Sequence, residues 1–226
     1  MTSFVLVPGA GGQAWYWHRV VPLLQRHGHT AVAVELPATD ETAGLAEYAD
    51  AIVEASPEGE VVVVAQSMAG FSAPLVADRL PVTQFVLVNA MVPVPGETLG
   101  QWWESVDQSG AARAFALAEG RDPDAPFDPW ETFFHDVPAD VTAAAQAGPP
   151  PEQADRPFGD PWPLPAWPNV RTRFLAGQLD RLFPLALQQR VVPERLGIAV
   201  EELPGGHLVA LSEPDALVDR LLLSRG

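Results

Sequence analysis

Three residues of this chain have the types that together activate a hydroxyl group for attack on a carbonyl carbon: Ser67, Asp180 and His207. A serine hydroxyl is a weak nucleophile at neutral pH, so an imidazole must take its proton during the attack and return it to the leaving group. A buried carboxylate fixes the tautomer of that imidazole and stabilises its protonated form. These three residues therefore predict a site for acyl transfer.

Ser67 ends a run of valines in the stretch VVVVAQSMAG, residues 61 to 70. A tight turn from a strand into a helix would lift its hydroxyl above the edge of a sheet, and such a turn requires small residues two positions before and after the serine. Ala65 and Ala69 meet this requirement, although the usual G-x-S-x-G pattern is here A-x-S-x-A. The alternative is that Ser67 only caps the helix that starts near Gly70.

The acid candidate, Asp180, follows a predicted strand by a short glycine-containing turn in FLAGQLDRLFP. The alternative for Asp180 is a pairing with Arg181, or a cap on the helix that starts at Phe183 and Pro184. Its position favours the first interpretation, because it shares one edge of the sheet with Ser67 and gives the order serine, acid, histidine.

The base candidate, His207, lies in the glycine-rich loop of LPGGHLVALSEP, directly after the last predicted strand. It is the one histidine placed where a base could reach Ser67. His27 and His29 have the spacing of two metal ligands, but no third ligand lies near them in the sequence. We therefore expect no metal site.

Backbone amides must stabilise the negative charge that develops on the carbonyl oxygen, each by roughly 3 to 4 kcal/mol. Met68 supplies the first candidate amide, because it follows Ser67 at a helix start. The glycine-rich loop VPGAGGQAWYW supplies the second, with Ala10 as first choice and Gly11 as second choice. The rival interpretation of this loop is phosphate binding, but PGAGGQA lacks the spacing of a dinucleotide site and no acid is suitably placed for a ribose. We expect no cofactor.

Six short apolar runs must position these residues. Because they are nearly continuous and rich in valine, they indicate strands that are covered on both faces of a parallel sheet. Helical patterns alternate with them, which predicts right-handed crossovers and a doubly wound α/β fold. The expected strands are 4–8, 30–36, 61–65, 84–90, 170–176 and 198–203, and the expected helices lie near 15–27, 43–55, 70–80, 184–192 and 213–224.

One segment, about 91–168, interrupts this alternation with no convincing strand and with many tryptophans and prolines. Its first half has a helical pattern, whereas repeated prolines exclude helix from the stretch 148–168. We expect a cap inserted after the strand 84–90 within a single domain of residues 1–226. A disordered linker or polyproline ligand is the alternative, but the tryptophans favour a packed cap.

The sequence resembles the α/β-hydrolase superfamily, within it the small esterase and hydroxynitrile-lyase branch that includes plant methylesterases. The matching stretches are FVLVPGAGGQAWYWHRVVPLL, VVVVAQSMAG, FVLVNAMVPVPGET, GQLDRLFP and PGGHLVALSEPDAL. The resemblance implies hydrolysis of a small ester by Ser67, Asp180 and His207, with Ala10 and Met68 as oxyanion donors. Pro8 and Gln66 each stand where the family commonly has a histidine.

Within that resemblance, cyanohydrin cleavage is disfavoured because the lyases typically use a pocket lysine and this chain has none. Two alternatives to an esterase remain open: a non-hydrolytic enzyme of natural-product metabolism, and a small-molecule receptor with little turnover. We expect a pocket with few charges for a mostly apolar ester or lactone of modest size. Its predicted lining is Gly11, Trp15 or Trp17, Met91, Val92, Trp103 and Trp130, of which Trp103 and Trp130 could also form the core of the cap.

Composition excludes several other functions. The formal net charge of −16 disfavours nucleic acid as a partner, and no apolar run approaches the roughly 18 residues of a membrane span. The chain has no cysteine for a disulfide, thiolate or metal site and no lysine for a Schiff base. The amino-terminal stretch lacks the pattern of a secretory signal, so we expect a cytoplasmic protein. The partner is expected to be a small molecule, and a homodimer stays open.

Overall fold

The computed structural model describes residues 1–223 and contains a six-stranded sheet in which all neighbouring strands are parallel. The strand order is β2-β1-β3-β4-β5-β6. Every strand expected from the valine-rich runs is present, which confirms the predicted α/β class. The strands are β1 Ser3–Val7, β2 Thr30–Ala33, β3 Val61–Gln66, β4 Val82–Val88, β5 Thr172–Gly177 and β6 Val200–Leu203.

Strand β3 lies in the interior of the sheet, between β1 and β4, and all six of its residues are buried. Val61 and Val63 pack into the hydrophobic cluster on one face of the sheet, whereas Val62 and Val64 pack into the cluster on the other face. Because both faces are covered, the strand needs apolar side chains at consecutive positions rather than at alternate ones. Branched valines suit this extended, buried backbone.

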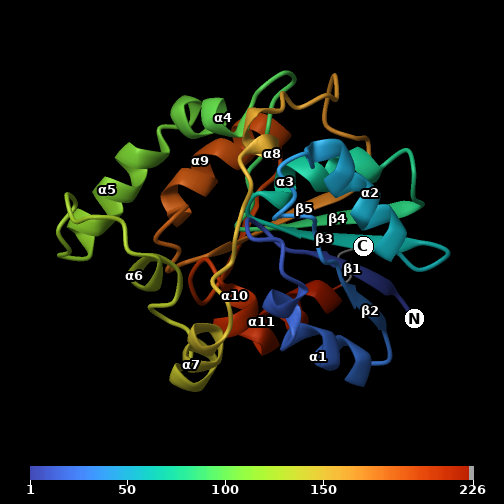
Figure 1. The fold of residues 1–226 in the computed structure, drawn as a ribbon, viewed down its shortest axis with the longest axis horizontal. Helices are drawn as coiled ribbons and strands as arrows, with labels where there is room; N and C mark the ends of the chain where they lie inside the picture. Colours follow the sequence, from blue (N-terminus) through green and yellow to red (C-terminus); the bar gives the residue numbers. More distant parts are fainter. Residues whose placement is uncertain (224–226) are drawn as a thin grey trace.

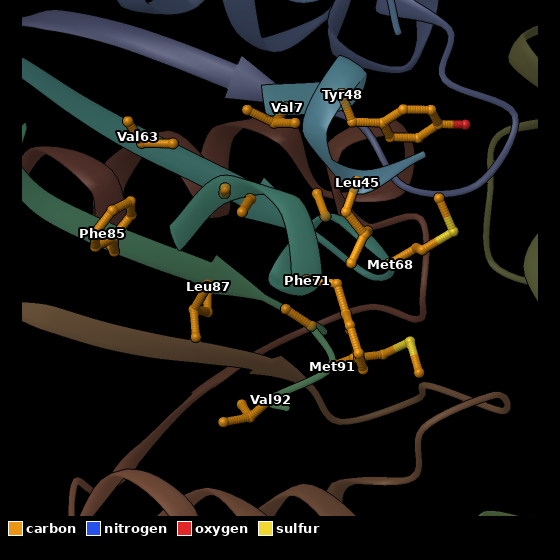
Figure 2. Packing of buried hydrophobic residues seen from close by; sticks show 14 of the residues in the cluster. Val7, Leu45, Tyr48, Val63, Met68, Phe71, Phe85, Leu87, Met91 and Val92 are labelled. Carbon is orange, nitrogen blue, oxygen red and sulfur yellow. The ribbon is translucent and has the colours of Figure 1, made fainter. Parts of the chain in front are cut away.

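Helices cover both faces of the sheet, as in a doubly wound fold (Figure 1). One cluster combines strand residues with side chains of α2 and α3, and Figure 2 shows Leu45, Tyr48 and Phe71 with Val63 and Leu87 among the residues of this cluster. The other cluster contains side chains of α1 and α11. The helices of these two layers are α2 Leu45–Ala55, α3 Ala69–Ser72 and α9 Leu185–Leu196 on the first face, and α1 Val20–Arg26 and α11 Pro214–Leu222 on the second.

Several predicted helices differ in extent from those observed. The pattern near 15–27 forms a 3₁₀ turn, η1 Ala14–Trp17, before α1, and the pattern near 70–80 forms α3 followed by a second 3₁₀ turn, η2 Ala73–Val76. Pro74 accounts for the second difference, since proline has no amide to continue the α-helical bonding. A short helix, α10 Val209–Ser212, was not expected. Residue 224, the predicted end of the last helix, lies outside the described residues.

Residues 91–168 contain helices but no strand. The stretch 148–168 was expected to exclude helix, yet α8 forms there because Pro157 occupies its first turn, where no amide is needed. Trp162 is buried and donates from Nε1 to the carbonyl of Phe71 in α3 at 3.1 Å, so this stretch packs on α3 instead of forming a free linker. The helices are α4 Leu99–Ser105, α5 Gln108–Ala118, α6 Pro129–Phe133, α7 Ala139–Ala147 and α8 Arg156–Gly159, and Figure 1 shows α5, α6 and α7 together beside the sheet.

Candidate active site

The turn between β3 and α3 holds Ser67 in the left-handed region, with φ of 54°. Its amide donates to the Val88 carbonyl at 3.2 Å, and its carbonyl accepts from the amides of Gly70 and Met91 at 3.2 and 3.0 Å. The turn therefore draws the start of α3 against the chain that follows β4. A Cβ atom added to Gly70 would lie 1.8 Å from the Met91 carbonyl oxygen, so glycine is required at this position.

Three side chains from different loops form one hydrogen-bonded chain. The Ser67 Oγ lies 3.0 Å from Nε2 of His207, and Nδ1 of His207 lies 2.8 Å from Oδ2 of Asp180. The exposed fractions are 8%, 2% and 0% for the serine, histidine and aspartate, so all three residues are largely shielded from bulk water. A carboxylate only accepts hydrogen bonds, which places the imidazole proton on Nδ1 and leaves Nε2 free to accept from the serine hydroxyl.

The structural alternatives for the serine and the aspartate do not hold. Helix α3 begins after Met68, and no side chain caps it, so the Ser67 hydroxyl is not a helix cap. Arg181 forms ion pairs with Glu119 and Glu131 rather than with Asp180. Helix α9 starts at Leu185 with Pro184 as its N-cap residue and has no side-chain cap, so Asp180 does not cap it. The second carboxylate oxygen of the aspartate, Oδ1, accepts from the amides of Leu182 and Phe183, both at 2.8 Å, which fixes the orientation of the whole group.

The predicted oxyanion donors, Ala10 and Met68, lie in the wall of the cavity at Ser67. The amides of Ala10 and Met68 make no hydrogen bond within residues 1–223, and both residues line the cavity at Ser67. The amide of Gly11, the second choice for this role, donates instead to Oε1 of Gln153 at 3.0 Å. Of the three amides considered for this role, those of Ala10 and Met68 are therefore without a partner in the described residues, and that of Gly11 is not.

A cavity of about 1240 Å³ has Ser67 and His207 in its wall. Among the predicted lining residues, it brings together Gly11, Trp15, Met91 and Trp103.

Three predicted lining residues lie elsewhere, and each has another use. Trp17 is fully buried in the cluster around α1 and α11. Val92 is buried in the opposite cluster, and its carbonyl accepts from Nε1 of Trp102 at 3.1 Å. Trp130 is 40% exposed and packs on Phe134 at a centroid distance of 4.7 Å.

Aromatic rings flank the imidazole of His207 on two sides. Phe183 meets the imidazole edge-on, with ring centroids 5.2 Å apart. Phe133, which belongs to α6, has its ring centroid 5.4 Å from that of the imidazole. Both phenylalanines also line the cavity. Phe183 lies within the GQLDRLFP stretch, so the sequence contained a signal for it, whereas nothing in the sequence distinguished Phe133 from other aromatic residues of 91–168.

The cavity wall carries more charge than we expected. Most of the charged side chains in the wall come from α5, α6 and the chain between them. The arginines among them are already paired: Arg113 with Asp124, Arg121 with Glu119, and Arg181 with Glu131. The Arg113 guanidinium holds the pKa of the exposed Asp124 carboxyl below its usual value. The charged lining residues are Arg113, Arg121, Asp122, Asp128, Glu131 and Arg181.

Tyr16 is a further polar lining residue that sequence reasoning missed. Burial raises the pKa of its phenol far above the usual value, so the hydroxyl stays protonated, and it accepts from the amide of Ala210 at 3.4 Å.

Across residues 1–223, no group of three or more histidine, cysteine, aspartate or glutamate side chains could hold a metal ion. His29 instead accepts from the amide of Thr2 through Nδ1 at 3.2 Å. None of the helices described is long and apolar enough to cross a membrane.

Comparison with known proteins places this chain in a family. The model of the alpha/beta hydrolase family matches residues 4–220, so the chain belongs to that family. The probable esterase PIR7A of Oryza sativa subsp. indica is 29% identical over 249 residues, which cover 97% of this chain and 95% of that protein. Methylesterase 7 of Arabidopsis thaliana is 38% identical over 105 residues, 40% of each chain. The crystal structure of polyneuridine aldehyde esterase superimposes with a TM-score of 0.78 at 22% identity and 98% coverage of both chains.

Proposed function

We propose that this protein is a serine hydrolase that cleaves a mostly apolar ester or lactone through an acyl-enzyme intermediate. The observation that carries the proposal is the buried chain from Ser67 Oγ through His207 to Asp180, with contacts of 3.0 and 2.8 Å. Membership of a hydrolase family with esterase-named relatives supports the reaction class.

The proposed reaction has two stages. Nε2 of His207 takes the hydroxyl proton as Ser67 Oγ attacks the carbonyl carbon, and it returns that proton to the departing alcohol oxygen. Water then gives a proton to Nε2 and attacks the acyl-enzyme, which releases the acid and restores the serine hydroxyl. Asp180 stabilises the imidazolium in both stages without taking the proton itself. The amides of Ala10 and Met68 stabilise the oxyanion, each by roughly 3 kcal/mol.

The segment 91–168 is proposed to act as a cap that shapes the substrate cavity. Phe133 and Trp103 come from this segment and line the cavity, and the ring of Phe133 also lies beside that of His207. Asp136, also from this segment, accepts from the Gly206 amide at 2.5 Å, next to the proposed base. The segment therefore contacts the His207 loop as well as helix α3, and changes in it should alter substrate preference.

A fluorophosphonate probe tests the proposed function directly. We expect one probe per chain on Ser67, and no labelling of the folded Ser67→Ala variant, because the probe reacts with an activated serine hydroxyl. Intact-protein mass spectrometry measures the stoichiometry and peptide mapping gives the site. A folded wild-type chain that stays unlabelled would instead support a receptor with this fold.

The apolar side of the cavity predicts a preference among acyl groups. We expect p-nitrophenyl butyrate to be hydrolysed with at least about 10-fold higher kcat/KM than mono-p-nitrophenyl succinate, which has the same chain length but ends in a carboxylate. A carboxylate would lose its hydration beside arginines that are already paired. Release of p-nitrophenol and of the acid should be equal, and a preference for the charged ester would refute this expectation.

A further inference from the structure

The loop that carries His207 has little intrinsic order of its own. Gly205 and Gly206 precede the histidine, and Gly205 lies in the left-handed region with φ of 93°. Glycines leave the backbone free to move, yet Nε2 must stay 3.0 Å from Ser67 Oγ. A displacement of about 1 Å in such a group can cost on the order of 100-fold in rate. The loop therefore needs contacts from outside to hold the histidine in place.

Outside contacts do reach the loop: the Leu179 amide donates to the Gly205 carbonyl at 2.9 Å, and the Gly206 amide donates to Asp136 at 2.5 Å. At the carbonyls of Gly206 and His207, the contacts come from two buried amide side chains. Nε2 of Gln66 donates to the His207 carbonyl at 3.3 Å, and Nδ2 of Asn89 donates to the same carbonyl at 3.2 Å and to the Gly206 carbonyl at 3.0 Å. Within residues 1–223 no backbone amide donates to the His207 carbonyl. The exposed fractions of the Gln66 and Asn89 side chains are 3% and 0%, so these bonds are shielded from water.

The other end of each amide reaches a different loop of the site. Oε1 of Gln66 accepts from the Gly9 amide at 3.0 Å, which holds the loop that carries Ala10. Oδ1 of Asn89 accepts from the Gly177 amide at 2.7 Å, at the end of the strand that leads to Asp180. Gln66 thus connects the loop of His207 with the loop of Ala10, which we call the oxyanion loop. Asn89 connects the loop of His207 with the end of the strand before Asp180.

Close packing at Gly9 and at Gly177 leaves no room for a side chain at either position. A Cβ atom on Gly9 would lie 2.5 Å from Gln66 Oε1 and 2.8 Å from Ser67 Cβ. A Cβ atom on Gly177 would lie 2.5 and 2.8 Å from the carbonyl oxygens of Gly205 and Gly206. The glycines allow the loops to approach, and the two amides then fix the distance between them.

We propose that Gln66 and Asn89 act together as positioning residues, clamping the main chain of His207 so that its imidazole is aligned with Ser67 while the oxyanion loop is held in register. The proposal rests on the proposed hydrolase function. Gln66 directly precedes Ser67, and Asn89 lies directly after β4 with φ of 46°, a conformation that asparagine tolerates better than most residues. Both side chains therefore extend from backbone at the ends of β3 and β4, which the sheet holds in place.

The test replaces each amide and compares the variants with a matched control. Gln66→Met removes both hydrogen bonds at nearly constant volume, and Asn89→Asp keeps the acceptor for Gly177 while losing both donated bonds. Gln84→Met is the control. Gln84 lies on β4, toward the opposite end of the strand from Val88, and Val88 is the residue that pairs with Gln66. The Nε2 atom of Gln84 is buried and has no hydrogen-bond partner in the described structure. We expect kcat for p-nitrophenyl butyrate to fall by about 10- to 100-fold in the first two variants, with KM changed less than about threefold.

Coupling between the two positions separates a shared clamp from two independent defects. If both amides act on the one carbonyl of His207, the double variant should lose far less than the product of the two single losses. A strictly multiplicative loss would contradict the shared clamp. So would single variants whose kcat stays within twofold of the Gln84→Met control.

A spectroscopic measurement keeps this inference separate from the proposed function. The Nδ1 proton of His207, hydrogen-bonded to Asp180, should give a far-downfield proton resonance in the wild type and in Gln84→Met. We expect it to be broadened or lost in Gln66→Met and Asn89→Asp while the remaining spectrum stays that of a folded protein. An unchanged resonance overturns the clamp even if no ester is hydrolysed. Should Asn89→Asp fail to fold, Asn89→Gly removes the same side chain and still accepts the positive φ.

Discussion

Replacing Ser67 by alanine should lower kcat for ester hydrolysis by a factor on the order of 10⁵ to 10⁶, which is the loss expected when a serine nucleophile is removed. The Oγ atom is the part of the side chain that contacts His207, and an alanine at this position would leave Nε2 without that partner. The fold should persist, because the turn is held by backbone bonds from Ser67 to Val88, Gly70 and Met91. Initial rates with p-nitrophenyl esters and a thermal melt measure the two effects.

Ser72→Ala is the matched control for this prediction. Ser72 is also buried, lies in the same strand-to-helix region, and has a hydroxyl without a hydrogen-bond partner in the described structure. We expect its kcat to stay within about twofold of the wild type, since its hydroxyl contacts no reacting group. Equal, small losses in both variants would mean that the hydroxyl of Ser67 is not the nucleophile.

Replacing Asp180 by asparagine should lower kcat by up to about 10⁴-fold through the wrong imidazole tautomer. The structure gives a specific reason. Oδ1 accepts from the amides of Leu182 and Phe183, so the carbonyl oxygen of an asparagine would remain at that position. Its NH₂ group would then face Nδ1 of His207, which would have to accept, and the proton would move to Nε2. The base could no longer take the proton of Ser67.

Rates measured under single-turnover conditions check this second prediction, because they isolate the acylation step. The same variant should retain its fold and its KM, since the asparagine keeps both bonds to the loop amides. A variant with more than about a tenth of the wild-type rate would show that another carboxylate orients the histidine. Asp136 would then be the residue to replace, because it contacts the Gly206 amide beside His207.

Much of this arrangement was predictable from local patterns. The valine runs identified all six strands, because strands buried on both faces have a strong hydrophobic signal. Ser67, Asp180 and His207 could be selected because parallel strands end at one edge of a sheet, so the loops after them are neighbours. The helix near 70–80 was harder to delimit, because Pro74 changes the hydrogen-bonding pattern partway along an otherwise helical pattern.

The pocket was less predictable than the three hydrogen-bonded residues. Trp17 and Trp15 are two positions apart in one 3₁₀ turn, yet Trp17 is wholly buried whereas Trp15 lines the cavity. Their spacing shows that they point to different sides, but it does not show which side is the cavity. Met91 and Val92 are both buried in one hydrophobic cluster, but of the two only Met91 also lines the cavity. Such choices depend on which distant element packs against each side.

The sequence by itself determined the parallel sheet, the turn at Ser67 and the order of the residues placed at its edge, because each of these follows from hydrophobic burial or steric limits within a few residues. Only the tertiary structure decided that Gln66 and Asn89 meet at the carbonyl of His207, and that Gln153 accepts from the Gly11 amide. These contacts join residues 118 to 142 positions apart. Hydrogen bonds of this kind depend on the three-dimensional placement of whole loops, which no local pattern specifies.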